Sequence, residues 1–153
     1  MLDINKIRKD FPILDQKVNG QKLIYFDNAA TSQTPNQVVE SIVDYYQKTN
    51  SNIHRGNHKL SIQATTAYEA VRNELQKYFN SRLPQEIIFT SGTTQSINII
   101  TLGYTDLLTS DDEVIVSEME HHSNIVPIQM LCERTGAKLN VIPMDNQGNL
   151  IIK

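Results

Sequence analysis

The residues best suited to chemistry lie at positions 91–94, where an apolar run ends in Ser-Gly-Thr-Thr and a helical pattern begins. The first backbone N–H groups of a helix have no partner within it and lie at the positive end of its dipole, so they can bind an anion. The hydroxyl groups of Thr93 and Thr94 would add donors. The alternative to phosphate binding is that the segment is only a tight connection in which a hydroxyl caps the helix. The segment lacks the lysine of a Walker loop and the three glycines of a dinucleotide fingerprint. A small phosphate compound therefore fits this turn better than a nucleotide.

A second candidate lies at residues 118–124, where a histidine pair follows another predicted strand. His121 and His122 are adjacent, so on an extended stretch they point to opposite sides and only one can face a ligand. A histidine can act as acid or base near neutral pH, or lay its flat ring against another ring. A structural role is the alternative for either residue. The pattern predicts one functional histidine in this loop.

Two other histidines, His54 and His58, lie four positions apart, a spacing that resembles a metal-binding pair when it occurs on a helix. Gly56 and its polar neighbours favour a loop instead, and no cysteine or carboxylate at ligand spacing accompanies the pair. We therefore expect no metal here. Arg55 offers a planar donor fork to an anion or to a partner subunit, and its alternative is a solvated side chain beside a turn.

Both strands and helices, each recognised by its own spacing of apolar residues, must position these residues. Strands are predicted at residues 23–26, 86–90, 113–117 and 138–142. Helices are predicted at residues 34–49, with a capping box and a proline in the first turn, and at residues 61–79, 93–104 and 124–135, the last with Gly136 as its C-terminal cap. This alternation is typical of an α/β fold with a mostly parallel sheet.

The predicted order of elements has a geometric consequence. Crossovers between parallel strands are right-handed, and they place the carboxyl ends of all the strands at one edge of the sheet. The turn after residue 90 and the loop after residue 117 both leave such ends. We therefore expect Thr93, Thr94 and the histidine pair to face one crevice.

The composition excludes several classes of function. The 153 residues carry 14 basic and 17 acidic side chains, and the basic residues are scattered, which argues against a nucleic-acid-binding surface. No apolar run is long enough to span a membrane, and the N-terminus lacks the apolar stretch of a signal peptide. The single cysteine, Cys132, lies in an apolar segment and is expected to be a buried, inert thiol. These features predict a cytoplasmic protein.

Four segments together resemble the SUF-type (group II) cysteine desulfurases of the class-V aminotransferase family. They are YFDNAAT at 25–31, IHRG at 53–56, FTSGTTQSIN at 89–98 and MEHHSNIVP at 119–127. The resemblance implies a fold-type I transferase, a three-layer αβα domain that depends on pyridoxal 5'-phosphate. It further implies that residues 1–60 form an N-terminal arm and helix with active-site loops, and that residues 61–153 begin the cofactor-binding large domain.

The activity implied by the resemblance is removal of sulfur from L-cysteine, which leaves L-alanine and an enzyme persulfide. The expected partners are a second subunit in a homodimer and a sulfur-acceptor protein of iron–sulfur cluster assembly. Another class-V enzyme, such as a selenocysteine lyase, an aminotransferase or an epimerase, is the second interpretation. A non-enzymatic binding module built from the same half-fold is the third.

The resemblance also assigns roles to individual residues. Thr93 and Thr94 would hold the cofactor phosphate, and His121 would stack on the pyridine ring and assist proton transfer, whereas His122 is not the stacking position. The substrate-proximal residues that it implies are Asn28, Ala29, Ala30, His54 and Arg55, the last two near an active-site entrance of this or the opposite subunit. Ser91 and Gln95 stand where relatives often have arginine and glutamate, a departure that we expect only to tune the site.

Four functional residues of the family are expected beyond Lys153. These are the lysine that binds the cofactor, the aspartate that pairs with the pyridine nitrogen, the cysteine that carries the persulfide and the arginine that grips the substrate carboxylate. The resemblance covers well under half of the family's length. We therefore expect the 153-residue chain to be a fragment, inactive alone and poorly soluble because its apolar faces and sheet edge are unpaired.

Overall fold

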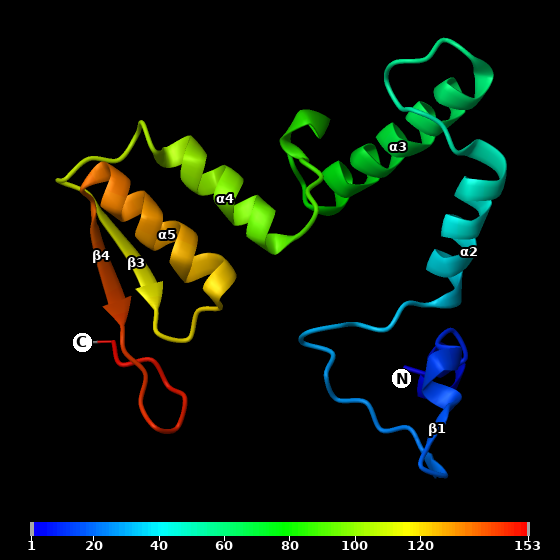
Figure 1. Ribbon diagram of the computed structural model, residues 1–153, viewed down its shortest axis with the longest axis horizontal. Helices are drawn as coiled ribbons and strands as arrows, with labels where there is room; N and C mark the ends of the chain where they lie inside the picture. The colour runs from blue at the N-terminus through cyan, green and yellow to red at the C-terminus, as the bar shows by residue number, and fades with distance from the viewer. Residues whose placement is uncertain (1, 153) are drawn as a thin grey trace. The chain divides into compact units, whose positions relative to one another are not determined.

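A computed structural model describes residues 2–152 and divides the chain into two compact units, Met1–Ile87 and Ile88–Lys153 (Figure 1). The elements of the first unit are α1 (Ile4–Arg8), the 3₁₀ helix η1 (Pro12–Asp15), β1 (Lys17–Val18), β2 (Gln21–Lys22), α2 (Asn36–Asp44), the π-helix η2 (Tyr45–Thr49), α3 (Lys59–Tyr78) and the 3₁₀ helix η3 (Pro84–Glu86). Those of the second are α4 (Thr93–Tyr104), β3 (Glu113–Ser117), α5 (His122–Thr135) and β4 (Lys138–Ile142). The predicted domain division at residue 60 stays a prediction.

The second unit is an α/β arrangement built on two parallel strands. β3 pairs with β4 in a register that joins Glu113 to Lys138 and Ser117 to Ile142. The connecting helix α5 packs against both strands, and α4 packs beside α5. Figure 1 shows α4 and α5 side by side, with their N-terminal ends at the same end of the unit as the arrowheads of β3 and β4. The parallel pairing predicted for residues 113–117 and 138–142 is confirmed.

The two helices of this unit begin and end where local signals place them. α4 occupies the predicted residues 93–104. α5 begins at His122, two positions before its predicted start, because the ring of His121 caps the helix by accepting a hydrogen bond from the Ser123 N–H. It ends at Gly136, whose φ of 79° is the left-handed conformation that glycine adopts readily at this position. The predicted C-terminal cap is therefore confirmed.

Two predicted strands are wrong. Residues 87–90 follow η3 without forming a strand, although Ile87 has the extended φ and ψ of −91° and 113°. Residues 23–26 follow the two-residue strand β2, and Leu23 makes one further bond, from its N–H to the Gln16 carbonyl at 2.9 Å. A strand exists only where a neighbouring strand satisfies its backbone, and among residues 2–152 neither segment has one.

The predicted capping box of the second helix is also wrong. Pro35 is the cap residue of α2 rather than its first helical residue, and no side chain satisfies the cap. The Asn36 N–H instead donates to the Asp10 carbonyl at 2.8 Å, a tertiary contact that no local pattern encodes. The helical path continues through η2 and ends at Thr49, as predicted. α3 begins at Lys59, two positions early, because the ring of His58 accepts a bond from the Ser61 N–H.

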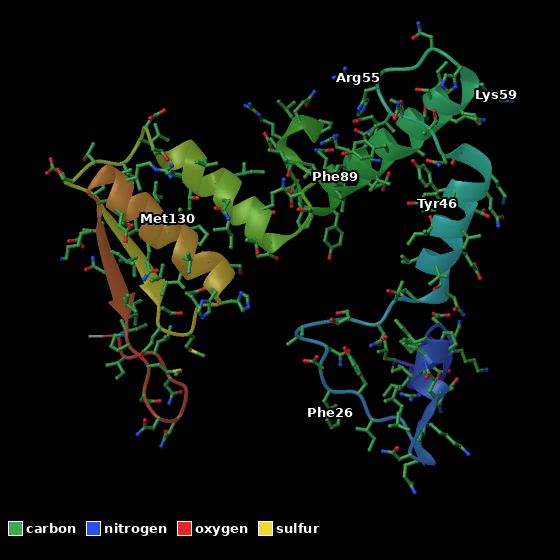
Figure 2. All side chains as sticks on the ribbon, viewed as in Figure 1. Phe26, Tyr46, Arg55, Lys59, Phe89 and Met130 are labelled. Atoms are coloured by element: carbon green, nitrogen blue, oxygen red, sulfur yellow. The ribbon has the colours of Figure 1, made fainter. Side chains whose placement is uncertain are left out.

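The buried core of the described residues is small. In the second unit it includes Val116, Leu131, Cys132 and Ala137, and burial raises the pKa of the Cys132 thiol. The predicted buried cysteine is thus confirmed. Many large apolar side chains are exposed, with Phe26 92% accessible (Figure 2). Within residues 2–152, no helix combines the length and the apolar character needed to cross a bilayer.

Candidate functional site

The turn before α4 has a conformation that depends on glycine. Gly92 has φ and ψ of 152° and 176°, a backbone conformation that residues other than glycine rarely adopt. Around it, the Gln95 side-chain oxygen accepts from the backbone N–H of Ser91 at 2.6 Å and from its hydroxyl at 2.9 Å. The hydroxyls of Thr90 and Ser96 lie 2.7 Å apart across the same turn. These contacts hold the first turn of α4 in one orientation.

The same turn presents unused hydrogen-bond donors. Among residues 2–152, no group accepts from the backbone N–H of Thr93, Thr94 or Gln95. The hydroxyls of Thr93 and Thr94 are likewise without partners in the described part of the chain, and both residues are exposed. These backbone N–H groups and hydroxyls belong to the first turn of α4, at the positive end of the helix dipole, and such donors are what a phosphate group requires.

The loop between β3 and α5 is fixed by two carboxylates. Glu120 accepts from the Ser117 hydroxyl at 2.8 Å and from the Asn124 side-chain amide at 2.7 Å. Glu118 accepts from the backbone N–H of Met144 at 2.8 Å, which ties the loop to the segment after β4. The hydrogen bonds from Asn124 and then Ser117 lower the pKa of Glu120. His121 therefore follows a loop whose backbone is held from both sides.

The hydrogen bonds of His121 define its neutral tautomer. Its Nδ1 atom accepts from the Ser123 N–H at 3.1 Å and lies 2.9 Å from the Ser123 hydroxyl. An amide N–H can only donate, so Nδ1 carries no proton and the neutral ring is protonated at Nε2. The ring of His122 meets that of His121 edge-on, with centroids 6.3 Å apart, and does not cap the helix. The neutral ring of His121 is thus held in place by Ser123, with its proton on Nε2.

The directions of α4 and α5 relate the two candidate groups. One groove is lined by Ile97 and Tyr104 of α4, by Asn124 and Leu131 of α5, and by residues of β3. Figure 1 shows that α4 and α5 run in the same direction. Thr94 lies in the first turn of α4, and His121 is the cap residue of α5. Both residues lie where the carboxyl ends of the parallel strands point, which is where ligands bind in sheets of this kind.

The remaining predicted site residues belong to the first unit. Asn28, Ala29 and Ala30 lie in an exposed turn closed by the bond from the Ala30 N–H to the Asp27 carbonyl at 3.2 Å. His54 is bonded to Glu69 through its ring, and Arg55 is exposed. Their predicted proximity to substrate stays a prediction.

Sequence reasoning missed the residues that support the candidate site. Glu120 and Asn124 are four positions apart across the start of α5, a spacing that brings a carboxylate and an amide into contact at a helix start. Ser61, Thr65 and Glu69 repeat at the same spacing along α3. The signal that could have identified them is this spacing of polar residues, across a predicted helix start for Glu120 and Asn124 and beside the loop containing Gly56 for the residues of α3.

Replacing Asn124 with alanine is expected to raise the pKa of Glu120 toward its ordinary value, because the Asn124 amide is the largest cause of the lowered pKa. A carboxylate with a lowered folded-state pKa stabilises the fold above its unfolded pKa, and this contribution is lost as the pH falls through the folded value. A carbon-13 NMR titration of the Glu120 carboxyl measures the shift. An unchanged Glu120 pKa would contradict this account, and Gln129→Ala on the same helix is the control.

The chain was compared with known protein families and with curated proteins. The family model of aminotransferase class-V matches residues 24–153. A probable cysteine desulfurase of Staphylococcus aureus is 51% identical over 152 residues, which are 99% of this chain and 37% of that protein. A probable cysteine desulfurase of Synechocystis sp. is 49% identical over 142 residues, 92% of this chain and 34% of that protein. The chain therefore spans about a third of the length of these relatives.

Solved structures share the fold. The apo structure of a cysteine desulfurase from Thermococcus onnurineus NA1 has a TM-score of 0.84 and 39% identity, and the likeness covers 98% of this chain and 36% of that one. The cysteine desulfurase CsdA (S-sulfonic acid) from Escherichia coli has a TM-score of 0.74 and 33% identity over 96% of this chain and 36% of that one. The predicted α/β fold and the resemblance to cysteine desulfurases are confirmed. The match over residues 24–153 shows that the chain belongs to the class-V aminotransferase family.

Proposed function

We propose that the protein containing this chain is a cysteine desulfurase of the SUF type that uses pyridoxal 5'-phosphate. Its reaction removes sulfur from L-cysteine and leaves L-alanine and an enzyme persulfide. The proposal is supported by the sequence identity of 51% and 49% between this chain and two relatives named as probable cysteine desulfurases. The observation that carries it is that the Thr93–Thr94 turn begins α4 and His121 caps α5, two neighbouring helices whose N-terminal ends lie on the strand-end side of one α/β unit (Figure 1).

The donors of the turn fit the phosphate of this cofactor. The N–H groups of Thr93, Thr94 and Gln95 and the two threonine hydroxyls, which have no partner among residues 2–152, match a dianionic ester. A Cβ built on Gly92 would meet nothing within 4 Å, so the approach to the turn is open. Thr93 and Thr94 would hold the phosphate, and the ring of His121 would lie on the pyridine.

The chain's own residues would bind and orient the cofactor, and one of them would move a proton. When bound, pyridoxal phosphate supplies an electron sink for the carbanion formed at the substrate Cα. The dipole of α4 and the threonine donors anchor one end of the cofactor. His121 limits rotation of the ring by stacking and carries a proton at Nε2, while Glu120 holds the preceding loop in place. Hydrogen bonds of side chains within the protein set the positions of these groups before any ligand binds.

The wider setting follows from the same proposal. A second copy of the protein would complete a homodimer, and a sulfur-acceptor protein of iron–sulfur cluster assembly would receive the persulfide sulfur. The proposed location of the protein is the cytoplasm. The decisive assay is the formation of alanine and persulfide from L-cysteine by the intact protein, expressed from its complete reading frame. Transamination, racemisation or a reaction limited to selenocysteine would instead favour another class-V enzyme.

Replacing Thr94 with valine in the intact protein is expected to weaken cofactor binding about tenfold to a hundredfold, because a hydrogen bond to a charged group contributes about 1.5–3 kcal/mol. Valine has the shape of threonine but no hydroxyl, whereas Thr94→Ser keeps the hydroxyl and serves as the matched control. Dialysis followed by measurement of cofactor absorbance gives the affinity. Equal retention by the valine and serine variants would argue against a phosphate at this turn.

A further inference from the structure

The hairpin formed by β1 and β2 turns through two residues, Asn19 and Gly20. Val18 pairs with Gln21 in the antiparallel register, so only these two residues connect the strands. Asn19 has a φ of 52° and Gly20 has a φ of 76°. Two positive φ values in a two-residue connection are typical of a type I′ turn, for which Asn-Gly is a preferred sequence. The turn is therefore specified by its own two residues.

Two groups of this turn that can react with each other are free. Among residues 2–152, no group accepts from the Gly20 N–H, and the side-chain amide of Asn19 has no hydrogen-bond partner. Both residues are exposed, and a Cβ built on Gly20 would meet nothing within 4 Å. A bond between the Gly20 nitrogen and the Asn19 Cγ atom closes a five-membered ring. The turn thus offers a nucleophile, a leaving amide and access for water at one place.

The hairpin that carries the turn is weak. Each of its strands has two residues, all of them exposed, and Lys17 lies directly opposite Lys22. Like charges in opposite positions destabilise a strand pair, and a two-stranded hairpin is only marginally stable in water. One further bond, from the Leu23 N–H to the Gln16 carbonyl at 2.9 Å, closes its open end. Local opening therefore gives Asn19 the freedom that ring closure requires.

Asn80 provides a reference within the same chain. Like Asn19, it is exposed and has a positive φ, in this case 54°. The residue after it is Ser81, which has a Cβ beside its nitrogen and whose N–H donates to the Gln76 carbonyl at 3.0 Å. Asn19 is the only asparagine in the sequence that precedes a glycine. The two asparagines thus differ in the access to the backbone nitrogen that follows them.

We infer that Asn19 is a site of spontaneous covalent modification, at which the asparagine is converted into aspartate and isoaspartate. The Gly20 nitrogen loses its proton to hydroxide and attacks the Asn19 Cγ atom. The bond from Cγ to the side-chain nitrogen breaks, and this nitrogen takes a proton from water and leaves as ammonia. Water then opens the cyclic imide. Cleavage between Cγ and the ring nitrogen gives aspartate, whereas cleavage between the α-carbonyl carbon and the ring nitrogen gives isoaspartate.

The two products affect the hairpin differently. Aspartate keeps the length of the backbone, and Asp-Gly is also a preferred sequence in type I′ turns. Isoaspartate adds one methylene group to the main chain, so the connection no longer fits the register that pairs Val18 with Gln21. The bond from the Leu23 N–H to the Gln16 carbonyl depends on the same register. Isoaspartate at position 19 therefore releases the segment that follows β2.

The modification is tested by incubating the intact, folded protein at mildly alkaline pH. Peptide mass spectrometry detects the replacement of an amide by a carboxyl group, and peptide fragmentation distinguishes isoaspartate from aspartate. Conversion at Asn19 is expected to be about tenfold or more faster than at Asn80, because glycine leaves the attacking nitrogen unhindered and lowers the barrier. Conversion at Asn19 no faster than at Asn80, or conversion that occurs only after unfolding in urea, would overturn the inference.

Substitution of Gly20 tests the attacking nitrogen. Gly20→Ala adds a Cβ beside this nitrogen and is expected to slow conversion at Asn19 about tenfold. Gly148→Ala is the matched control, because Gly148 also has a positive φ, 85°, and open space around it. It should leave the conversion at Asn19 unchanged. Equal rates of conversion in the Gly20→Ala variant and the parent protein would show that this nitrogen is not the nucleophile.

Amide hydrogen exchange at Leu23 measures the effect on the hairpin. Exchange is expected to be about threefold to tenfold faster in the fraction that contains isoaspartate, because the Leu23 N–H loses its acceptor. Freshly purified Asn19→Asp protein should exchange at the parent rate, since Asp-Gly preserves the turn. Unchanged exchange in the isoaspartate fraction would overturn the predicted release of the segment after β2. Neither measurement depends on the enzymatic activity.

Discussion

Substituting asparagine for His121 in the intact protein is expected to lower kcat by about a hundredfold or more, the usual contribution of a positioned acid–base group. Asparagine is a good cap residue, so it preserves the start of α5 that the histidine ring now caps. The loss then reports the missing imidazole rather than a frayed helix. Steady-state measurement of alanine formation gives kcat, and circular dichroism verifies the fold.

A phenylalanine at position 121 separates the two roles of the histidine. It keeps a flat ring for stacking on the cofactor but carries no proton at the Nε2 position. His121→Phe also removes the cap of α5, so circular dichroism must show that the fold is kept; the variant is then expected to retain the cofactor while kcat falls. His122→Asn is the matched control, because His122 does not cap the helix, and it should leave kcat nearly unchanged. A larger loss from His122 than from His121 would contradict the assignment.

The second large effect is expected for Gly92→Ala. The φ and ψ of Gly92, 152° and 176°, place a Cβ in a strained conformation, which costs about 1–3 kcal/mol. The turn would relieve this strain by shifting, and the shift would displace the N–H groups of Thr93 and Thr94. Both stability and cofactor affinity should therefore fall together. Thermal unfolding of the apoprotein and the dissociation constant for pyridoxal phosphate measure the two losses.

Gly103→Ala is the control, and it is expected to change stability in the opposite direction. Gly103 lies inside α4, has no positive φ, and a Cβ there would meet nothing within 4 Å. Alanine in a helix interior is favoured over glycine by about 0.5–1 kcal/mol, so this variant should be slightly more stable and bind the cofactor normally. Full cofactor affinity in Gly92→Ala would show that the turn conformation is not needed for binding.

The elements of the second unit were predictable because their determinants are local and their partners lie within the chain. The apolar periodicity of residues 93–104 and the glycine at position 136 define helix bounds without any tertiary information. The strands at 113–117 and 138–142 pair with each other, so each satisfies the other's backbone. The prediction from sequence agrees with the structure where both partners of an interaction lie within the predicted elements.

The failures have one physical origin. Residues 86–90 have the composition of a strand, but strand formation is decided by a neighbour that sequence composition does not supply. The start of α2 likewise depends on the carbonyl of Asp10, which is distant in the sequence. A missing strand partner decided the first outcome, and a long-range hydrogen bond decided the second. Local propensity therefore overestimated the regular structure at residues 23–26 and 86–90.

The candidate site was predicted in part. Thr93, Thr94 and His121 follow from strand-to-helix turns and from the resemblance, which are both readable in the sequence. The support supplied by Glu120 was missed, because its partners Ser117 and Asn124 become neighbours only when β3 ends and α5 begins in the observed geometry. A residue's chemistry is encoded by its type, whereas its role in holding a neighbour is encoded by the fold.

The most direct test of the central claim is a crystal structure of the intact protein with pyridoxal 5'-phosphate. The account predicts phosphate oxygens within hydrogen-bond distance of the N–H groups and hydroxyls of Thr93 and Thr94, with the ring of His121 lying on the pyridine. A phosphate held elsewhere, or a His121 ring that does not touch the bound cofactor, would contradict it.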